Sequence, residues 1–178
     1  MLKGKEVTLR PIREDDLSSF VEWFNDQEVT RYLTHYLPLT ETFEKKWIEE
    51  TAAKREPVFI IEARDKEGHI VAIGACGLHK VNHKNANAEL GIIIGEKDCW
   101  GRGLGCEALT LLIDYGFNFL NLHKIYSGAY KLNKRSIKLH LKLGFVPEGE
   151  RKEHVFTDGQ YHDLLEFGLL REDWKKQK

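Results

Sequence analysis

Three glycines at alternate positions constrain this chain more than any other feature. Gly101, Gly103 and Gly105 lie in "WGRGLG", after the strand-like segment "AELGIIIG" and before a helix-like segment over 104–119. A strand that turns into a helix through such a loop leaves backbone amides open at the positive end of the helix dipole. These amides can bind a pyrophosphate without a metal ion. The glycines alone are equally consistent with a tight turn that binds no ligand.

Two common phosphate-binding patterns do not fit this loop. A Walker A loop ends in Gly-Lys-Ser/Thr, whereas Cys106 and Glu107 follow the third glycine here. A dinucleotide fingerprint needs Gly or Ala at position 106 and an acidic residue about 20 positions further on. No Asp or Glu occurs between Asp114 and Glu148. The loop is therefore expected to bind neither a nucleoside triphosphate nor a dinucleotide.

The order of hydrophobic patterns indicates an α+β fold with one mixed central sheet. Period-2 patterns predict strands and period-3.6 patterns predict amphipathic helices. The strand-helix-strand part predicts a parallel pair with a crossover, and the strands on either side are expected to be antiparallel. Strands are predicted within 6–12, 57–64, 70–81, 85–98, 123–130 and the hairpin 153–170, and helices over 13–26, 39–55, 104–119 and 133–145. We expect a single domain over residues 1–178.

Composition excludes several classes of protein. The chain is 42% hydrophobic and 31% charged, with a formal net charge of -1, which argues against bulk nucleic-acid binding. The chain has an odd number of cysteines, Cys76, Cys99 and Cys106, and none of them forms a CxxC motif. Neither a disulfide framework nor a metal site is therefore expected. The N-terminus has no signal-peptide pattern, and no apolar run approaches the ~20 residues of a membrane span. We expect a cytoplasmic protein without a membrane partner.

A basic stretch lies in the predicted helix 133–145 and just before it. Most of its side chains are expected to form a solvated helix face, although a basic helix beside a phosphate nest suits a ligand with several phosphates. A nucleic-acid partner is the weakest interpretation of the same cations, which are Lys131, Lys134, Arg135, Lys138 and Lys142.

These motifs together resemble the GNAT family of N-acetyltransferases. "WGRGLGCEAL" is similar to the loop with which the family binds the acetyl-CoA pyrophosphate, although Trp100 stands where the family has Arg or Gln. An aromatic residue there is typical of the ribosomal-protein-alanine acetyltransferase branch. The stretches 9–17, 133–145 and 148–170 also resemble that branch, and spermidine acetyltransferases look equally similar. The resemblance covers nearly the whole chain in the right order.

The resemblance implies a GNAT fold, with a parallel strand pair that splays apart to admit the pantetheine arm. It implies direct transfer of an acetyl group from acetyl-CoA to a primary amine, without a metal ion. The cofactor-binding residues that it implies are Ile92, Ile93, Ile94, Trp100, Gly101, Arg102, Gly103, Leu104, Gly105, Asn133 and Ser136. Cys99 and Cys106 are interpreted as packing residues, because direct transfer needs no acyl-cysteine.

Three residues are candidates for the chemistry. Glu89 precedes the isoleucines and is the candidate base that removes a proton from the amine, with a structural carboxylate as the alternative. Many relatives place a Tyr seven residues after the Asn, as the acid that protonates the leaving thiolate; His140 occupies this position here. The alternative for His140 is a partly exposed helix residue. Ser136 is a second candidate near the sulfur. A Glu in the last hairpin of a protein-acetylating relative aligns with Val155, so its role is not carried over.

The acceptor is expected to enter over the N-terminal helices. Glu41, Glu44, Glu49 and Glu50 have helical spacing and are expected to be solvated; in a cleft they would favour a cationic acceptor. Tyr32, Tyr36 and Trp47 either line this side or pack in the core. The preferred acceptor is a protein N-terminus. Small amines such as polyamines, amino sugars or antibiotics, and a non-catalytic acetyl-CoA-binding module, are the alternatives, and a homodimer is left open.

Overall fold

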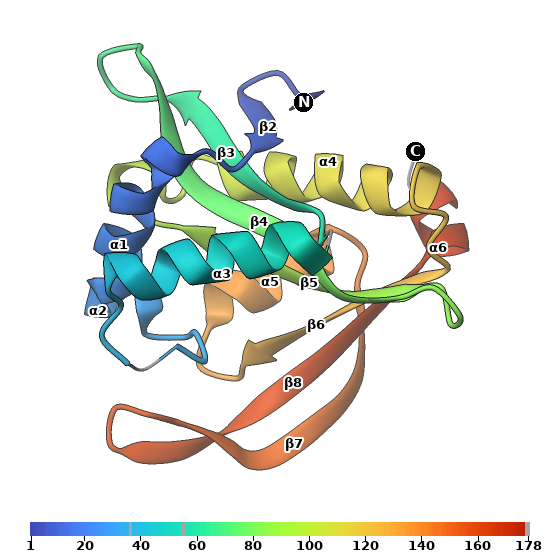
Figure 1. The fold of residues 1–178 in the computed structure, drawn as a ribbon. Helices are drawn as coiled ribbons and strands as arrows, with labels where there is room; N and C mark the ends of the chain where they lie inside the picture. Colours follow the sequence, from blue (N-terminus) through green and yellow to red (C-terminus); the bar gives the residue numbers. More distant parts are fainter. Residues whose placement is uncertain (36, 55, 177–178) are drawn as a thin grey trace. The chain divides into compact units, whose positions relative to one another are not determined.

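The computed structural model describes residues 1–35, 37–54 and 56–176 (Figure 1). The chain divides into two compact units. The first comprises Met1–His79 and Gly91–Leu112, and the second comprises Lys80–Leu90 and Ile113–Lys178. The expectation of a single domain stays a prediction. None of the helices in the described ranges is long and apolar enough to cross a membrane.

The elements follow the order expected from the sequence. The chain as far as the glycine loop forms β1 Leu2–Lys3, β2 Val7–Pro11, a 3-10 turn Glu14–Asp16, α1 Leu17–Asn25, α2 Gln27–Thr30, α3 Glu41–Lys54, β3 Val58–Arg64, β4 Ile70–Asn82, β5 Asn87–Ile94 and a 3-10 turn Lys97–Cys99. After the loop come α4 Leu104–Asn118, β6 Lys124–Tyr130, α5 Lys134–Lys142, β7 Val146–Thr157, β8 Gln160–Leu170 and α6 Arg171–Lys176.

The sheet is mixed, as predicted. Hydrogen bonding orders the strands β1-β2-β3-β4-β5-β6-β8-β7. The pairs β1–β2, β2–β3 and β3–β4 of the first unit are antiparallel, as are β6–β8 and β7–β8 of the second. The pair β5–β6 is parallel, with Asn87 opposite Lys124 and Glu89 opposite Tyr126. The α+β class and the parallel crossover around α4 are therefore confirmed.

The structure differs from the sequence prediction at a few element ends. The helix predicted over 13–26 is a 3-10 turn followed by α1, and Asp26 then starts α2 by accepting the Glu28 and Val29 amides. The short β1, α2 and α6 were not predicted, because two to six residues carry too little periodicity. The predicted hairpin over 153–170 is confirmed, with its turn at Asp158–Gly159, but β7 begins at Val146 (Figure 1).

The core of the first unit forms around α1. Phe20 and Trp23 are buried with Ile60 and Ala75. The indole of Trp23 donates to Glu96 Oε1 at 2.9 Å and lies over Gly95, where a Cβ would be 2.0 Å from its Cγ. This close approach explains the glycine at the end of β5.

A buried ion pair joins β2 to the start of α1. Arg10 donates two hydrogen bonds of 2.7 Å to Asp16, and its Nε contacts Glu62 on β3. Burial opposes ionisation of Asp16, but the bonds from Arg10 and from the Arg13 amide outweigh it and lower the pKa of Asp16 below its ordinary value. The pair therefore fixes how the chain enters α1.

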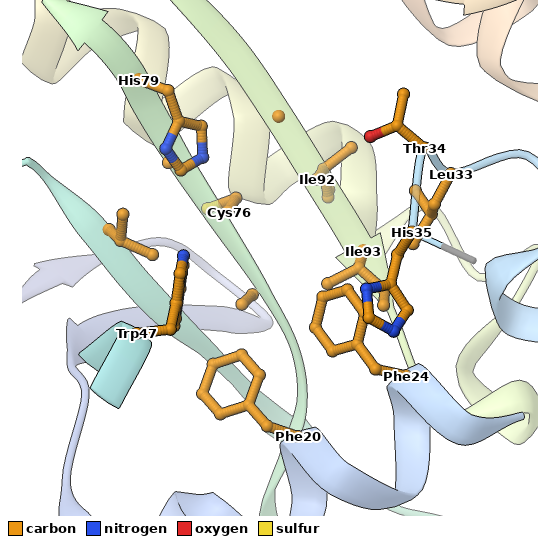
Figure 2. Close-up of a pocket in the computed structure, with 14 residues that line it drawn as sticks. Phe20, Phe24, Leu33, Thr34, His35, Trp47, Cys76, His79, Ile92 and Ile93 are labelled. Atoms are coloured by element: carbon orange, nitrogen blue, oxygen red, sulfur yellow. The ribbon is translucent and has the colours of Figure 1, made fainter. Parts of the chain in front are cut away.

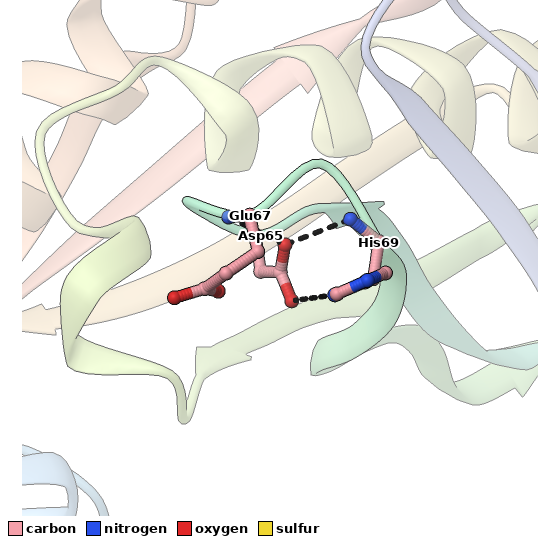
Figure 3. A group of neighbouring side chains, drawn as sticks. All are labelled: Asp65, Glu67 and His69. Atoms are coloured by element: carbon pink, nitrogen blue, oxygen red, sulfur yellow. Dashed lines mark hydrogen bonds and ion pairs between the residues drawn. The ribbon is translucent and has the colours of Figure 1, made fainter.

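The β3–β4 turn gathers Asp65, Glu67 and His69 (Figure 3). One Asp65 oxygen accepts the amides of Glu67 and His69 at 2.9 and 2.8 Å, and the other lies 3.4 Å from His69 Nδ1. Gly68 takes a φ of +89° in the same turn. These bonds are those of a carboxylate that stabilises a tight turn, and they account for the cluster.

Candidate active site

The glycine loop of the first unit presents unpaired amides. Gly101 and Gly103 have φ values of +77° and +83°, and a Cβ on either would meet no atom within 4 Å. Gly103 O accepts the amides of Cys106 and Glu107, which begins α4. Within the described ranges, the amides of Gly103, Leu104 and Gly105 donate to no protein acceptor, as expected at the first turn of a helix. The loop is thus an open cradle that fits an anionic group.

The side chains around this cradle hold it in place. Trp100 Nε1 donates to Ile94 O at 2.8 Å, and the Arg102 guanidinium donates to Arg64 O at 2.9 Å. These bonds hold both side chains against the protein beside the loop. The α4 carboxylate of Glu107 accepts the Lys5, Glu6 and Val7 amides and ties the N-terminal strands to the loop. The sequence analysis missed this role of Glu107.

One edge of β5 lacks regular pairing after Glu89. The hydrogen-bond ladder with β6 ends at Glu89. The hydroxyl of Ser127 then donates a hydrogen bond of 3.0 Å to the carbonyl oxygen of Leu90. Leu90 O and Ile94 O are both bonded by side chains, and backbone groups alternate between the two edges of a strand. Ile92 therefore directs its N–H and C=O to the same edge as Leu90 and Ile94, where an extended ligand could pair with them.

A cavity of about 190 Å³ lies beside β5 in the first unit (Figure 2). Ile92 and Ile93 contribute to its wall from β5, and Cys76 and His79 from β4. Trp47 lines it from α3, as the sequence analysis allowed. The other lining residues are Phe20, Phe24, Leu33, Thr34, His35, Val58, Ala75, Gly77 and Gly91. His79 and His35 lie at opposite ends in Figure 2.

The acidic face of α3 is not uniformly solvated. Glu41 and Glu50 are exposed as expected, but Glu44 is only 3% exposed. Its Oε1 has no hydrogen-bond partner among the described residues, and burial raises the pKa of Glu44 to about 7. The expectation of a solvated Glu44 is therefore wrong, because this side of α3 packs inward together with Trp47 and Thr51.

Tyr32, Tyr36 and Glu49 were the other residues named for the acceptor side. Tyr32 lies under the Arg31 guanidinium, 5.4 Å from ring centroid to Cζ, and does not line the cavity. Tyr36 and the side chain of Glu49 lie outside the described part of the chain.

The second unit contains the other predicted cofactor residues. Asn133 caps α5: its Oδ1 accepts the Ser136 amide at 3.0 Å, which leaves the side-chain NH₂ as its remaining donor. Lys131 pairs with Glu150 and Asp163, whereas Lys134, Lys138 and Lys142 are exposed along α5. Lys131 is thus committed to a carboxylate network, and the cations of α5 form the solvated face that was expected.

His140, the candidate acid, is buried, so the alternative of a partly exposed helix residue is wrong. Its ring stacks on Phe167 at 4.9 Å and meets the edge of Phe145 at 5.2 Å, with 3% of the residue exposed. Nδ1 donates to Ser136 O at 2.8 Å, and Nε2 is enclosed without a partner among the described residues. Burial lowers the pKa of His140, which favours the neutral ring. We therefore do not assign the acid role to His140, because a neutral, enclosed Nε2 has no proton to give.

Glu89 forms an ion pair in the second unit. Its Oε2 lies 2.7 Å from Lys80 Nζ. The hydrogen bond and charge of Glu89 raise the pKa of Lys80, so this ammonium keeps its proton. The role of Glu89 as the base stays a prediction.

The structure adds one imidazole–carboxylate pair that the sequence analysis missed. His79 Nδ1 lies 3.0 Å from Glu56 Oε2, although the two residues are 23 positions apart. No local motif marks such a pair, since it forms only when the segment before β3 lies beside β4. Cys99, expected as a packing residue, is buried, whereas Cys106 is half-buried; burial raises the pKa values of Cys76 and Cys99, which keeps both thiols protonated.

Comparisons with known proteins match this architecture. Residues 6–146 match the family model described as "Acetyltransferase (GNAT) domain". Spermidine N(1)-acetyltransferase of Escherichia coli (strain K12) is 30% identical over 179 residues, covering 98% of this chain and 91% of the relative. The crystal structure of spermidine N-acetyltransferase from Vibrio cholerae in complex with CoA and spermine has a TM-score of 0.87, with 26% identity over 97% of this chain and 99% of the other.

Similarity to the ribosomal branch is more limited. The [ribosomal protein uS5]-alanine N-acetyltransferase of E. coli (strain K12) is 41% identical, but over 86 residues, which is 48% of this chain and 43% of the relative. Assignment to that branch is thus not supported over the whole chain. The chain belongs to the GNAT family of acetyltransferases, and it is an enzyme whose acetyl donor is acetyl-CoA.

Proposed function

We propose that this enzyme acetylates a small cationic amine of the polyamine type. The observation that carries the proposal is the buried carboxylate of Glu44 on the helix that lines the cavity. This replaces the protein N-terminus that the sequence analysis preferred. Similarity over nearly the full chain to spermidine acetyltransferases supports the replacement.

Glu44 is placed to attract an ammonium group. Trp47, three residues later, lines the cavity, and Thr40 and Phe43 line a second hollow of about 220 Å³ that shares Thr34 and His35 with the first. Residues three or four apart on a helix are neighbours, so Glu44 is one helical turn from a residue that lines each hollow, although it lines neither itself. An ammonium bonded to Oε1 would offset the free-energy cost of burying this carboxylate. A polyamine carries a second cation for this purpose, and a simple monoamine does not.

The donor is proposed to lie along the glycine loop and β5. Its pyrophosphate would accept hydrogen bonds from the amides of Gly103, Leu104 and Gly105, and its pantetheine arm would pair with the backbone of Ile92. The predicted contacts of Ile93, Ile94, Trp100, Gly101, Arg102, Asn133 and Ser136 with acetyl-CoA belong to the same proposal. A cytoplasmic location and a homodimer also stay predictions. Within the described ranges, the three cysteines form no disulfide.

The test is CoA release from acetyl-CoA with spermidine, spermine, butylamine and a basic peptide that begins with alanine. We expect saturable release with the polyamines at the highest kcat/KM. A higher kcat/KM for the peptide would overturn the acceptor class in favour of a protein N-terminus. Acetyl-CoA binding with no release for any amine would indicate a non-catalytic module.

The Glu44→Gln variant links the acceptor class to the structure. A hydrogen bond to a charged group contributes roughly 1.5–3 kcal/mol, so kcat/KM for spermidine should fall about tenfold or more. For butylamine, which has no second ammonium, the change should be much smaller. Equal losses with both amines would show that Glu44 does not recognise the second cation.

A further inference from the structure

His79 lies at the cavity wall, in space that two neighbouring glycines leave open. Its side chain is 34% exposed and projects from β4 beside Cys76 and Ile92 (Figure 2). A Cβ on Gly77 would lie 3.2 Å from His79 Nε2, and a Cβ on Gly91 would lie 3.5 Å from it. Glycines on the same strand and on the neighbouring strand β5 thus leave room for the ring.

The hydrogen bond to Glu56 sets the protonation of the ring nitrogens. A carboxylate accepts but does not donate, so Nδ1 carries the hydrogen and donates to Glu56 Oε2 at 3.0 Å. In the neutral ring, Nε2 then carries the lone pair. A base that is oriented by a carboxylate is a recurrent arrangement in catalysis.

We infer that His79 is the general base that deprotonates the acceptor amine, and that Glu56 is its positioning residue. The inference rests on the proposed function. The ammonium of the acceptor gives a proton to Nε2, and the freed nitrogen lone pair forms a C–N bond to the acetyl carbon. The C–S bond breaks, and the electron pair leaves with sulfur as thiolate, which takes the proton of the imidazolium directly or through water. The acetylated nitrogen loses its second proton to solvent water, which leaves the neutral amide and CoA thiol.

Other titratable groups near the cavity are less suited to this task. His35 lies at the opposite end, and its ring meets the edge of Phe24 at 5.3 Å. Its Nε2 is buried without a partner among the described residues. The Cys76 thiol is fully buried, which raises its pKa and keeps it protonated. Glu44 lies on α3, where it is proposed to face the second ammonium. The carboxylate that accompanies the His79 ring is Glu56, from the segment before β3.

The experiment compares His79→Gln, Glu56→Gln and His69→Gln, with spermidine as acceptor. His69 is the matched control, because it is an imidazole that also pairs with a carboxylate, Asp65, but lies in the exposed β3–β4 turn. The measurements are kcat and KM from pH 5.5 to 9, and CoA affinity by calorimetry. In addition, the imidazole signals in NMR are followed during a spermidine titration with CoA present, which needs no turnover.

We expect His79→Gln to lower kcat about 10²–10⁴-fold with unchanged CoA affinity, and to abolish the fall of kcat/KM at acidic pH. Glu56→Gln should lower kcat less, with a small effect on KM, and His69→Gln should match the parent. The His79 signals, identified by their loss in His79→Gln, should shift when spermidine binds. A parent-like pH profile in His79→Gln, with the parent active, would overturn this inference alone. Absence of spermidine-dependent release in the parent would overturn the proposed acceptor and this inference with it.

Discussion

Replacement of Glu44 by Gln should change how stability depends on pH. The pKa of Glu44 rises from an ordinary value of 4.5 to about 7 in the folded protein, because the carboxyl group is buried. The folded state therefore holds a proton that the unfolded state releases between these two values. Stability is highest below pH 4.5 with respect to this group, and falls as pH rises through the range to about 7.

The magnitude follows from the size of the shift. One pKa unit corresponds to about 1.4 kcal/mol, so a shift from 4.5 to about 7 destabilises the folded parent by about 3 kcal/mol at alkaline pH. Most of this loss falls between pH 5 and pH 8. Gln keeps the shape without the charge, so Glu44→Gln should gain about 2–3 kcal/mol relative to the parent between these two pH values.

The assay is urea unfolding of both proteins at pH 5 and pH 8, without ligands. Glu41→Gln is the matched control: it removes a carboxylate from an exposed position one turn earlier on α3. If the difference between Glu44→Gln and the parent is the same at both pH values, the carboxylate is solvated and the argument from burial is wrong. Spermidine should stabilise the parent more than Glu44→Gln at pH 8.

Three further substitutions test other parts of the first unit. Gly103→Ala should weaken CoA binding at least about tenfold in calorimetry, because a Cβ strains a residue with a φ of +83°. Gly105→Ala is the control: Gly105 has a helical position where a Cβ makes ordinary contacts, so this variant should lose less affinity. Equal CoA affinities of the two variants would contradict the loop assignment. Asp16→Asn should cost about 3–5 kcal/mol in urea unfolding at pH 7, with a smaller difference as acid protonates the parent carboxylate, because the buried Arg10 then keeps only Glu62 as a carboxylate partner; a loss under 1 kcal/mol would refute this. Gly95→Ala should lower Tm and cost about 1–3 kcal/mol, because its Cβ would lie 2.0 Å from an indole ring; an unchanged Tm would show that the ring moves freely.

The local backbone features were predictable from the sequence. Positive φ at Gly101 and Gly103, the Asn133 cap and the Asp158–Gly159 turn each depend on a few consecutive residues, whose preferred dihedral angles and short-range hydrogen bonds specify the geometry. The order of strands and helices follows from periodicity for the same reason. The parallel pair β5–β6 was expected because a helix separates the two strands.

The environment of single side chains was decided by the tertiary structure. Helical spacing gives Glu41 and Glu44 the same local character, and only the packing of α3 buries one and exposes the other. His140 has the position of a catalytic residue in the sequence, but the aromatic rings of Phe145 and Phe167 enclose it.

The candidate base shows the same division between sequence and structure. His79 and Glu56 are each unremarkable in the chain, and they become a pair because β3 and β4 bring them within 3.0 Å. The sequence by itself thus determined the fold, the family and the glycine loop that we propose to hold the donor, since these depend on patterns along the chain. The tertiary structure decided which groups are buried or paired, since burial and charge pairing depend on distances through space between residues far apart in sequence.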